Sequence, residues 1–516
     1  MDNQDRRLLE ACILGGEELN KKAITCEYPL DAFIIEKLRT LTVLISDDAE
    51  EYEIFNHRKN IDDLWGVLLE KAIKCLRYYD KREPFIKSLG KKTPKAYGIA
   101  ELKEYYTQYS DFERVLYGSS RYYRDHVIHV FRTWMSGIEL LTKNSCACLS
   151  EIRINEKNIT ISLEAAEKIS IWTIVALTHD LGYPLQKAKD IIGITQRMIA
   201  TFITNPDISV DFSFHGVQNY MNDFIVRLMS SKMVERKERG SDGSDEKKYV
   251  ARLQPKYYFK FQKSLERNDH GILSTLIIYK LLTYFLESDY NINEDYTFME
   301  EDCRQFYIRR EILRAIASHT CNDVYQLYMG SFSFLLRVCD DTQEWGRKYL
   351  SELYVKSRQK YEYGDIDLIF KDKKQNECTI TESVEISEKD KELVAQLLIR
   401  YYKQALEYVT IFRDGQDTGL RDFSFTRIMK ISCGKIEFQL ILAIKQDDAS
   451  LLKVGIKYTS TANKNKEFGP EFFTSHNIIT DGKFLIKDGD GNSDVDSKPS
   501  LWRSGEFYMP LEPMQK

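Results

Sequence analysis

The sequence contains little proline and no long uninterrupted apolar run. Ten prolines in 516 residues leave room for long helices, because proline breaks or kinks the interior of a helix. No segment reaches the roughly 18 consecutive apolar residues that a membrane-spanning helix needs, and the amino-terminal residues lack a basic segment followed by an apolar core. We therefore expect no membrane insertion and no export, and a cytoplasmic protein.

Neither sign of charge dominates the chain. The 74 basic and 79 acidic residues give a formal net charge of −5. Such a balance lacks the basic excess that attracts a protein to nucleic acid or to an anionic membrane. A glycine-rich phosphate loop of the type G-x-x-x-x-G-K-[ST] is also absent. Any phosphate-binding site must therefore be local and built from other residues.

Paired cysteine spacings are missing as well. The ten cysteines are scattered, and the closest two, Cys146 and Cys148, are separated by one residue rather than by the two of a zinc-type C-x-x-C. In a long chain this distribution is typical of reduced thiols in the cytosol. A disulfide-stabilised secreted fold is therefore not expected.

Length and patterning divide the chain into three regions. A single core rarely grows beyond about 250 to 300 residues, so this chain predicts several domains. Apolar residues recur at three- and four-residue steps through 1–110 and 111–350, which predicts an amino-terminal helical region and a helical middle domain. A charged, Gly- and Ser-rich stretch at 237–248 is expected to be an exposed or disordered loop. Alternating strand patterns around one long helical pattern in 351–516 predict a smaller α+β domain.

The eight histidines are unevenly distributed, because six lie between residues 126 and 319. His270 begins one apolar helical pattern, while His319 and Asp340 end two others. Each alone is better explained as a core histidine or a capping aspartate, and His215 as an ordinary loop residue. Several such residues in one domain favour a shared function, since buried imidazoles and carboxylates are costly unless paired or bound to a cation.

The dipeptide His179-Asp180 closes the apolar pattern "SIWTIVALTHD", and Gly182 follows it. Glycine lets the chain turn away without a β-carbon. Adjacent side chains on a helix diverge by about 100°. His179 and Asp180 can therefore bind the same ion only if that ion lies near the axis that they share, and Asp180 is free to bridge to a second ion. His126 and His129, three residues apart, would share one helix face.

The order of these residues resembles the H…HD…D signature of the HD-domain metal-dependent phosphohydrolase superfamily. The matching residues, and the further histidines similar to those of its two-metal branches, are His126, His179, Asp180, His270, His319 and Asp340. The resemblance covers residues 111–350. It implies an all-helical catalytic domain that binds one or two divalent ions of Mn, Fe, Co, Ni, Mg or Zn. It also implies hydrolysis of a phosphoester or phosphoanhydride by a metal-activated water.

Two choices within this set stay open. The His-x-x-x-Val spacing favours His126 over His129 as the ligand, and Asp340 is preferred to Asp341 because it directly follows the apolar run. Arg347 is expected two turns beyond Asp340 on the same helix. There it would reach a substrate phosphate or pair with a neighbouring acid.

On this resemblance Asp180 would bridge the metals, and His270 and His319 would hold a second metal or act on the phosphate as donor or general acid. A nucleotide-like small molecule is the preferred substrate. The near-neutral charge weighs against nucleic acid. The alternatives are a nuclease or cyclic-nucleotide phosphodiesterase, and a non-hydrolytic module whose carboxy-terminal domain binds a protein partner.

Overall fold

The chain forms two compact units in a computed structural model, one made of residues 1–324 and 330–356 and the other of residues 325–329 and 357–516. The structure describes residues 3–22, 24–44, 52–82, 98–119, 124–156, 159–201, 217–239, 245–287, 296–321, 329–347, 361–364, 366–370, 377–390, 393, 394, 397, 401, 404, 408, 423–434, 436–446, 452–460 and 505–509. All structural statements below concern these residues. His215 and the tip of the expected loop at 240–244 lie outside them.

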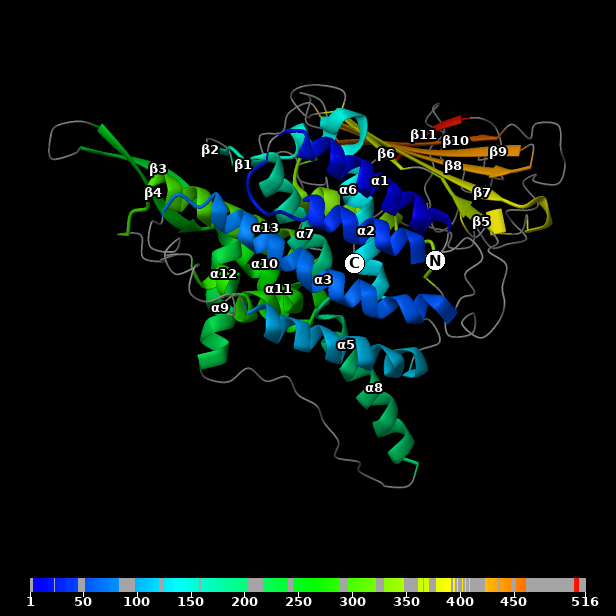
Figure 1. Cartoon of the computed structure of the whole chain (residues 1–516), viewed down its shortest axis with the longest axis horizontal. Helices are drawn as coiled ribbons and strands as arrows, with labels where there is room; N and C mark the ends of the chain where they lie inside the picture. Colours follow the sequence, from blue (N-terminus) through cyan, green and yellow to red (C-terminus); the bar gives the residue numbers. More distant parts are fainter. Residues whose placement is uncertain are drawn as a thin grey trace. The chain divides into compact units, whose positions relative to one another are not determined.

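The first unit is built mainly of helices (Figure 1). They are α1 (Asn3–Asn20), α2 (Ala32–Leu44), α3 (Tyr52–Tyr78), α5 (Ile99–Ser119), α6 (Val127–Glu151), α7 (Ala165–Thr178), α8 (Tyr183–Ile199), α9 (Val217–Ser230), α10 (Pro255–Glu266), α11 (His270–Leu281), α12 (Thr283–Leu286), α13 (Glu300–Ser318) and α14 (Phe332–Thr342). The helical periodicity of the amino-terminal and middle regions is thus realised as helices.

Helix α7 lies at the centre of this unit. Almost every one of its residues is buried, as expected of a helix that is apolar all round. It packs against α3, α6, α13 and α14. The indole N–H of Trp134 donates to the Thr173 hydroxyl at 3.0 Å, and that of Trp172 donates to the Trp134 carbonyl at 3.0 Å. Each large ring therefore fills core volume without leaving its donor unsatisfied.

The amino-terminal helices belong to the same compact unit as α7. Trp65 on α3 donates from its indole N–H to the Leu177 carbonyl at 2.9 Å. Tyr105 on α5 donates from its hydroxyl to the Leu181 carbonyl at 2.7 Å. These two bonds hold the chain on either side of His179-Asp180.

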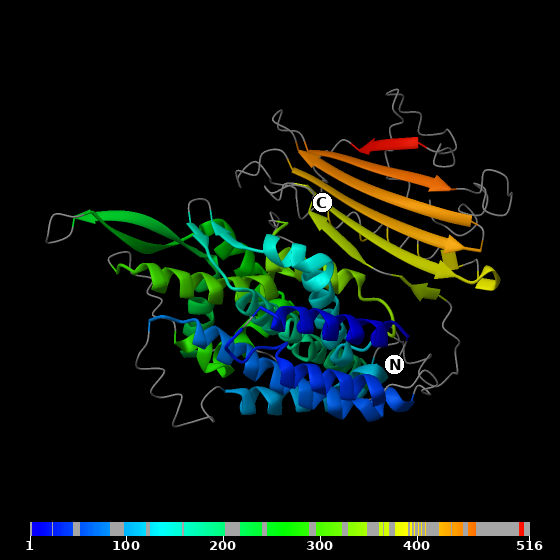
Figure 2. The ribbon, with the colours of Figure 1, turned by 45° about the horizontal axis from the view of Figure 1, so that its top comes forward.

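Two short hairpins accompany the helices: β1 (Ile154–Glu156) with β2 (Ile159–Ile161), and β3 (Ser231–Arg239) with β4 (Asp245–Leu253). The second hairpin includes both ends of the stretch 237–248, which therefore differs from the expected loop; Figures 1 and 2 show it extending beyond the helices. Its charges are compatible with strands because opposite charges meet diagonally, as in Lys248–Glu238 at 3.1 Å. At its base, Met233 and Ala251 are buried.

The second unit contains one mixed sheet (Figure 2). Its strands are β5 (Tyr361–Tyr363), β6 (Asp367–Phe370), β7 (Glu377–Ile386), β8 (Phe423–Cys433), β9 (Ile436–Gln446), β10 (Leu452–Ser460) and β11 (Gly505–Met509). The order is β11-β10-β9-β8-β7-β5, with β6 also paired to β7, and β7–β8 is the parallel pair among the described strands. A short 3₁₀ helix, Glu388–Asp390, follows β7.

Parallel neighbours need a crossover connection, and the long helical pattern of the sequence lies between β7 and β8. Of it, the structure describes isolated helical positions, among them Tyr408. The Tyr408 ring stacks on Phe425 of β8 with ring centroids 5.3 Å apart. On the same strand, buried Arg427 donates to the Glu382 carboxylate of β7 at 2.5 Å. A buried charge is thus paired within the sheet.

The described part of the chain is therefore mainly helical, with a smaller sheet region in its carboxy-terminal part, as the patterning predicted. None of its helices combines the length and apolarity needed to cross a bilayer.

A buried ion pair links the first helix to the site-bearing region. Asp5 on α1 accepts from Arg132 on α6 at 2.7 Å and from the indole N–H of Trp345 at 2.9 Å, and all three side chains are buried. We expect Asp5→Ala to lower the free energy of unfolding by about 3–5 kcal/mol, because Arg132 would stay buried without its partner. Urea denaturation measures this loss. Arg6→Ala removes an exposed pair and should change stability by less than about 1 kcal/mol; equal effects of the two variants would contradict this account.

Candidate metal centre

Helix ends deliver a cluster of histidines and aspartates to one place in the first unit. The contributing positions are the residue preceding α6 (His126), its first turn (His129), the end of α7 (His179) and the turn after it (Asp180), the start of α11 (His270), the end of α13 (His319) and the last turn of α14 (Asp340). All residues of the predicted set are therefore brought together.

The Asp180 carboxylate occupies the middle of the cluster. The nearest nitrogens to its Oδ2 are His126 Nδ1 at 2.9 Å and His129 Nε2 at 3.9 Å, and those to its Oδ1 are His270 Nε2 at 3.2 Å, His319 Nε2 at 3.5 Å and His179 Nε2 at 3.6 Å. Asp340 approaches the same nitrogen of His129, with Oδ1 at 2.9 Å from its Nε2. Two carboxylates thus share one set of imidazoles.

Two groups of three side chains have ligand atoms within 4.8 Å of one another and could each hold a metal ion. One group is His129, His179 and Asp340, and the other is His179, Asp180 and His319. His179 belongs to both. The Nε2 atom of His179 has one lone pair and binds one ion, so the two groups mark two possible positions of an ion beside His179, and a second ion would need the remaining ligands.

Four of the histidines have an acceptor behind the ring. Their Nδ1 atoms face Ala176 O at 2.8 Å (His179), Ile316 O at 2.5 Å (His319), Gln186 Oε1 at 2.6 Å (His270) and Gln343 Oε1 (His129). A carbonyl oxygen can only accept, so the proton is assigned to Nδ1 and the Nε2 lone pair is directed into the cluster. Metal-binding histidines in proteins are oriented in this way by an outer acceptor.

Two observations show that the cluster suits a cation. The Nε2 atom of His179 is buried and has no hydrogen-bond partner among the residues that the structure describes. Helices α7 and α13 end at His179 and His319, so the partial negative charge of their last carbonyls is directed toward the cluster. A positive ion would satisfy both the lone pair and the helix ends.

The electrostatics favour a neutral His179 beside an ionised Asp180. Burial lowers the pKa of His179 to about 4, against the opposing effect of Asp180 and Asp340. Burial alone would raise the pKa of Asp180, but the surrounding histidines hold it well below the usual range. Burial opposes protonation of His319, yet hydrogen bonding to Asp180 raises its pKa. Neutral imidazole and ionised carboxylate are the forms that bind metal.

Three side chains of the cluster are partly exposed to solvent. The side chains of His126, His270 and Asp340 are 12%, 19% and 22% exposed, whereas His179 and His129 are 0% and 1% exposed. A substrate would therefore approach past the first three residues.

The structure places His129, rather than the preferred His126, in a ligand group with His179 and Asp340. Helix α6 begins at Val127, and His126 precedes it with φ −114°, so the expected helical spacing of the two histidines does not apply. The ring centroids lie 6.0 Å apart at 84°. His126 directs Nδ1 at Asp180 and stacks on Tyr183, with ring centroids 3.8 Å apart.

The other open choices are also resolved by position. Asp341 faces away into a pair with Arg337 at 2.8 Å, while Asp340 contacts His129. Arg347 is not on the helix of Asp340, because α14 ends at Thr342; it lies instead beside His126.

The outer acceptors were not anticipated from the sequence. Gln186 and Gln343 are far from their histidine partners along the chain. Ser274, on α11, accepts from the Gly182 N–H at 2.7 Å and lies 2.6 Å from the His179 carbonyl. The one sequence feature that could have indicated Gln186 is weak: it is a polar residue in the first turn of α8, one helical turn after Gly182.

Comparison with protein-family models, curated proteins and solved structures found no match for this chain. The function of the cluster is therefore argued from its geometry and from the residue order.

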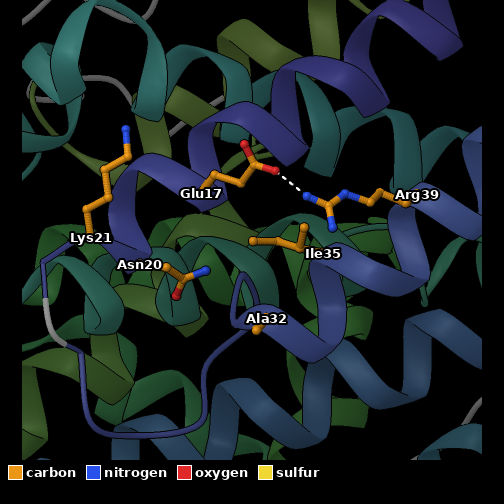
Figure 3. Close-up of a pocket in the computed structure, with 6 residues that line it drawn as sticks. All are labelled: Glu17, Asn20, Lys21, Ala32, Ile35 and Arg39. Atoms are coloured by element: carbon orange, nitrogen blue, oxygen red, sulfur yellow. Dashed lines mark hydrogen bonds and ion pairs between the residues drawn. The ribbon is translucent and has the colours of Figure 1, made fainter.

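A hollow between α1 and α2 contains none of the cluster's residues. It is lined by Glu17, Asn20, Lys21, Ala32, Ile35 and Arg39 (Figure 3). Glu17 and Arg39 neutralise each other in an ion pair, as the figure shows. None of the cluster's residues lines this hollow, and its residue types suggest no chemistry.

Close packing explains the glycine after the dipeptide. A Cβ on Gly182 would lie 2.3 Å from the His270 carbonyl oxygen and 2.7 Å from the Ser274 nitrogen, so α11 would have to move. Its φ of −78° needs no glycine. We expect Gly182→Ala to lower the free energy of unfolding by about 1–3 kcal/mol. In the control variant Gly193→Ala on α8, the added Cβ meets only the end of Arg197 at 3.7 Å, so the free energy of unfolding should stay the same or rise. Chemical denaturation of both variants measures these changes. An unchanged stability in Gly182→Ala would contradict the close approach of α11.

Protonation should destabilise the metal-free protein in acid. The folded pKa values of His126 and His179 are about 3 and about 4, below the ordinary 6.5, so between pH 6.5 and about 4 the unfolded chain binds more protons. Stability then falls as pH falls, by about 1.4 kcal/mol per pH unit for each such proton. His319 acts in the opposite sense, and its contribution is lost only above pH 6.5. Urea denaturation of chelator-treated protein should give a steeper pH dependence for wild type than for His179→Ala; parallel curves would contradict the burial of a neutral ring.

Proposed function

We propose that this chain is a metal-dependent hydrolase that cleaves a phosphoester or phosphoanhydride bond in a nucleotide-like small molecule. The cluster of His129, His179, Asp180, His319 and Asp340 would hold one or two divalent ions. The residue order that resembles the HD-domain superfamily supports the same proposal.

One observation carries this proposal: histidine Nε2 atoms converge on Asp180 and Asp340 while their Nδ1 atoms are held from behind. A purely structural cluster would satisfy its buried polar atoms with one another. Here the Nε2 atom of His179 is left without a partner in the described residues, although it belongs to both ligand groups. A bound cation accounts for this arrangement.

A divalent ion in this cluster would supply a Lewis acid and a bound water whose pKa is lowered from 15.7 toward about 7. The protein's own residues complete the site. Asp180 and Asp340 neutralise positive charge, and Asp180 has an oxygen toward each side of the cluster. The partly exposed His270, which belongs to neither ligand group, is placed to donate a proton toward the leaving group.

The preference for a small substrate rests on charge. The chain as a whole carries a net charge of −5, so a long polyanion would meet no general attraction. Cleavage of a phosphodiester in nucleic acid or in a cyclic nucleotide is the nearest alternative reaction. A screen of nucleotides, cyclic nucleotides and single-stranded nucleic acid separates these substrate classes.

Metal content tests the proposal directly. We expect purified wild-type protein, loaded with manganese and then desalted, to retain close to one or two ions per chain by elemental analysis. His179→Ala should lose most of this metal, because His179 belongs to both groups. Asp340→Asn should bind metal more weakly, whereas Asp341→Asn is the matched control, since Asp341 pairs with Arg337 instead.

The same samples are assayed for phosphate release from nucleotides and for cleavage of cyclic nucleotides and single-stranded nucleic acid. We expect turnover of nucleotides that falls at least about 100-fold in His179→Ala. Metal-free wild type that stays inactive with added manganese would contradict the proposal and leave a structural cluster or a binding module.

A further inference from the structure

Arg347 is brought to the solvent side of the cluster by a rigid turn. Gln343 bridges His129 and the Trp345 carbonyl, to which its amide donates at 2.8 Å. Trp345 is buried and donates to Asp5. Gly346 then adopts φ +66°, and a Cβ there would lie 2.5 Å from the Arg132 guanidinium. The chain therefore changes direction at Gly346, a position that requires glycine, and the side chain of the next residue, Arg347, lies beside His126.

The position of Arg347 is unusual for a charged side chain. Its Nη2 lies 3.3 Å and 3.5 Å from the two ring nitrogens of His126, and its Nε donates to the Asp125 carbonyl at 3.2 Å. It is half-buried, yet within the part of the chain that the structure describes no carboxylate lies within ion-pair distance of it. The remaining guanidinium N–H groups can therefore donate to an anion from outside the protein.

The location identifies that anion. His126 is one of the three partly exposed side chains of the cluster. An anion bound by Arg347 would therefore lie at the entrance to the metal centre. A guanidinium offers paired N–H donors that match two oxygens of a tetrahedral oxyanion.

We propose that Arg347 binds a phosphate group of the substrate and presents it to the metal centre. This inference rests on the proposed function and extends it, since it assigns substrate binding to a residue outside the metal ligands. Arg347 supplies no metal ligand, so its loss should weaken phosphate binding and leave metal binding intact. A residue that merely held His126 in place would not show this separation.

Calorimetric titration of manganese-loaded protein with orthophosphate tests the inference. Arg347→Ala should weaken phosphate binding about tenfold or more, because a charge-assisted bidentate contact is lost. Arg347→Lys should fall between wild type and Arg347→Ala, since it keeps the charge but not the fork. Arg6→Ala, which removes the same charge from an exposed position, should bind phosphate as wild type does. Manganese content should be unchanged in all three variants.

The outcomes separate the two proposals. Wild type that binds manganese but shows the same phosphate affinity as Arg347→Ala, or no phosphate binding, overturns this inference and leaves the metal centre intact. Wild type that binds no manganese overturns the proposed function itself. Loss of both manganese and phosphate in Arg347→Ala, with Arg347→Lys equally impaired, would make Arg347 a structural support of His126 and also overturn the inference.

Discussion

The structure of the site depends on one buried carboxylate. Asp180 is almost inaccessible to water, and an ionised carboxylate in such a place is costly unless positive charge or hydrogen-bond donors surround it. The surrounding histidines meet that demand only in part, because the Nδ1 protons of His179 and His319 are directed at backbone carbonyls behind them. Their lone pairs and two carboxylates are left facing one another, and a divalent cation is the simplest group that satisfies all of them.

The rest of the first unit holds this arrangement in place. Trp65 on α3 and Tyr105 on α5 hold the chain on the two sides of His179-Asp180, so the amino-terminal helices support the centre. Packing of Gly182 against α11 brings His270 to the same carboxylate. Helices that are distant in sequence therefore converge because each begins or ends at the cluster, where side chains can reach one point from several directions.

The helical class, the strand-rich carboxy-terminal part and the residues of the cluster follow from local patterns in the sequence. The details that depend on tertiary contacts do not. The sequence favours His126 over His129 as the ligand, whereas His129 lies in a ligand group, because α6 begins one residue after His126 and the expected helical spacing does not apply. Strand β8 has the charged residue Arg427 on its buried side, which interrupts the alternation of apolar and polar residues expected of a strand. Only the tertiary contact with Glu382 explains this charge. The acceptor of His129, Gln343, lies far along the chain, so no spacing rule indicates it.

Anomalous X-ray scattering from a crystal of the manganese-loaded protein, collected above and below the metal absorption edge, tests the central claim most directly. The account predicts a peak within bonding distance of the His179 Nε2 atom, about 2.0–2.3 Å, together with an oxygen of Asp180 or Asp340. A second peak beside it would establish two ions. A crystal with full manganese in the buffer and no peak at the cluster would contradict a metal centre there. The histidines would then serve only to pair the buried carboxylates.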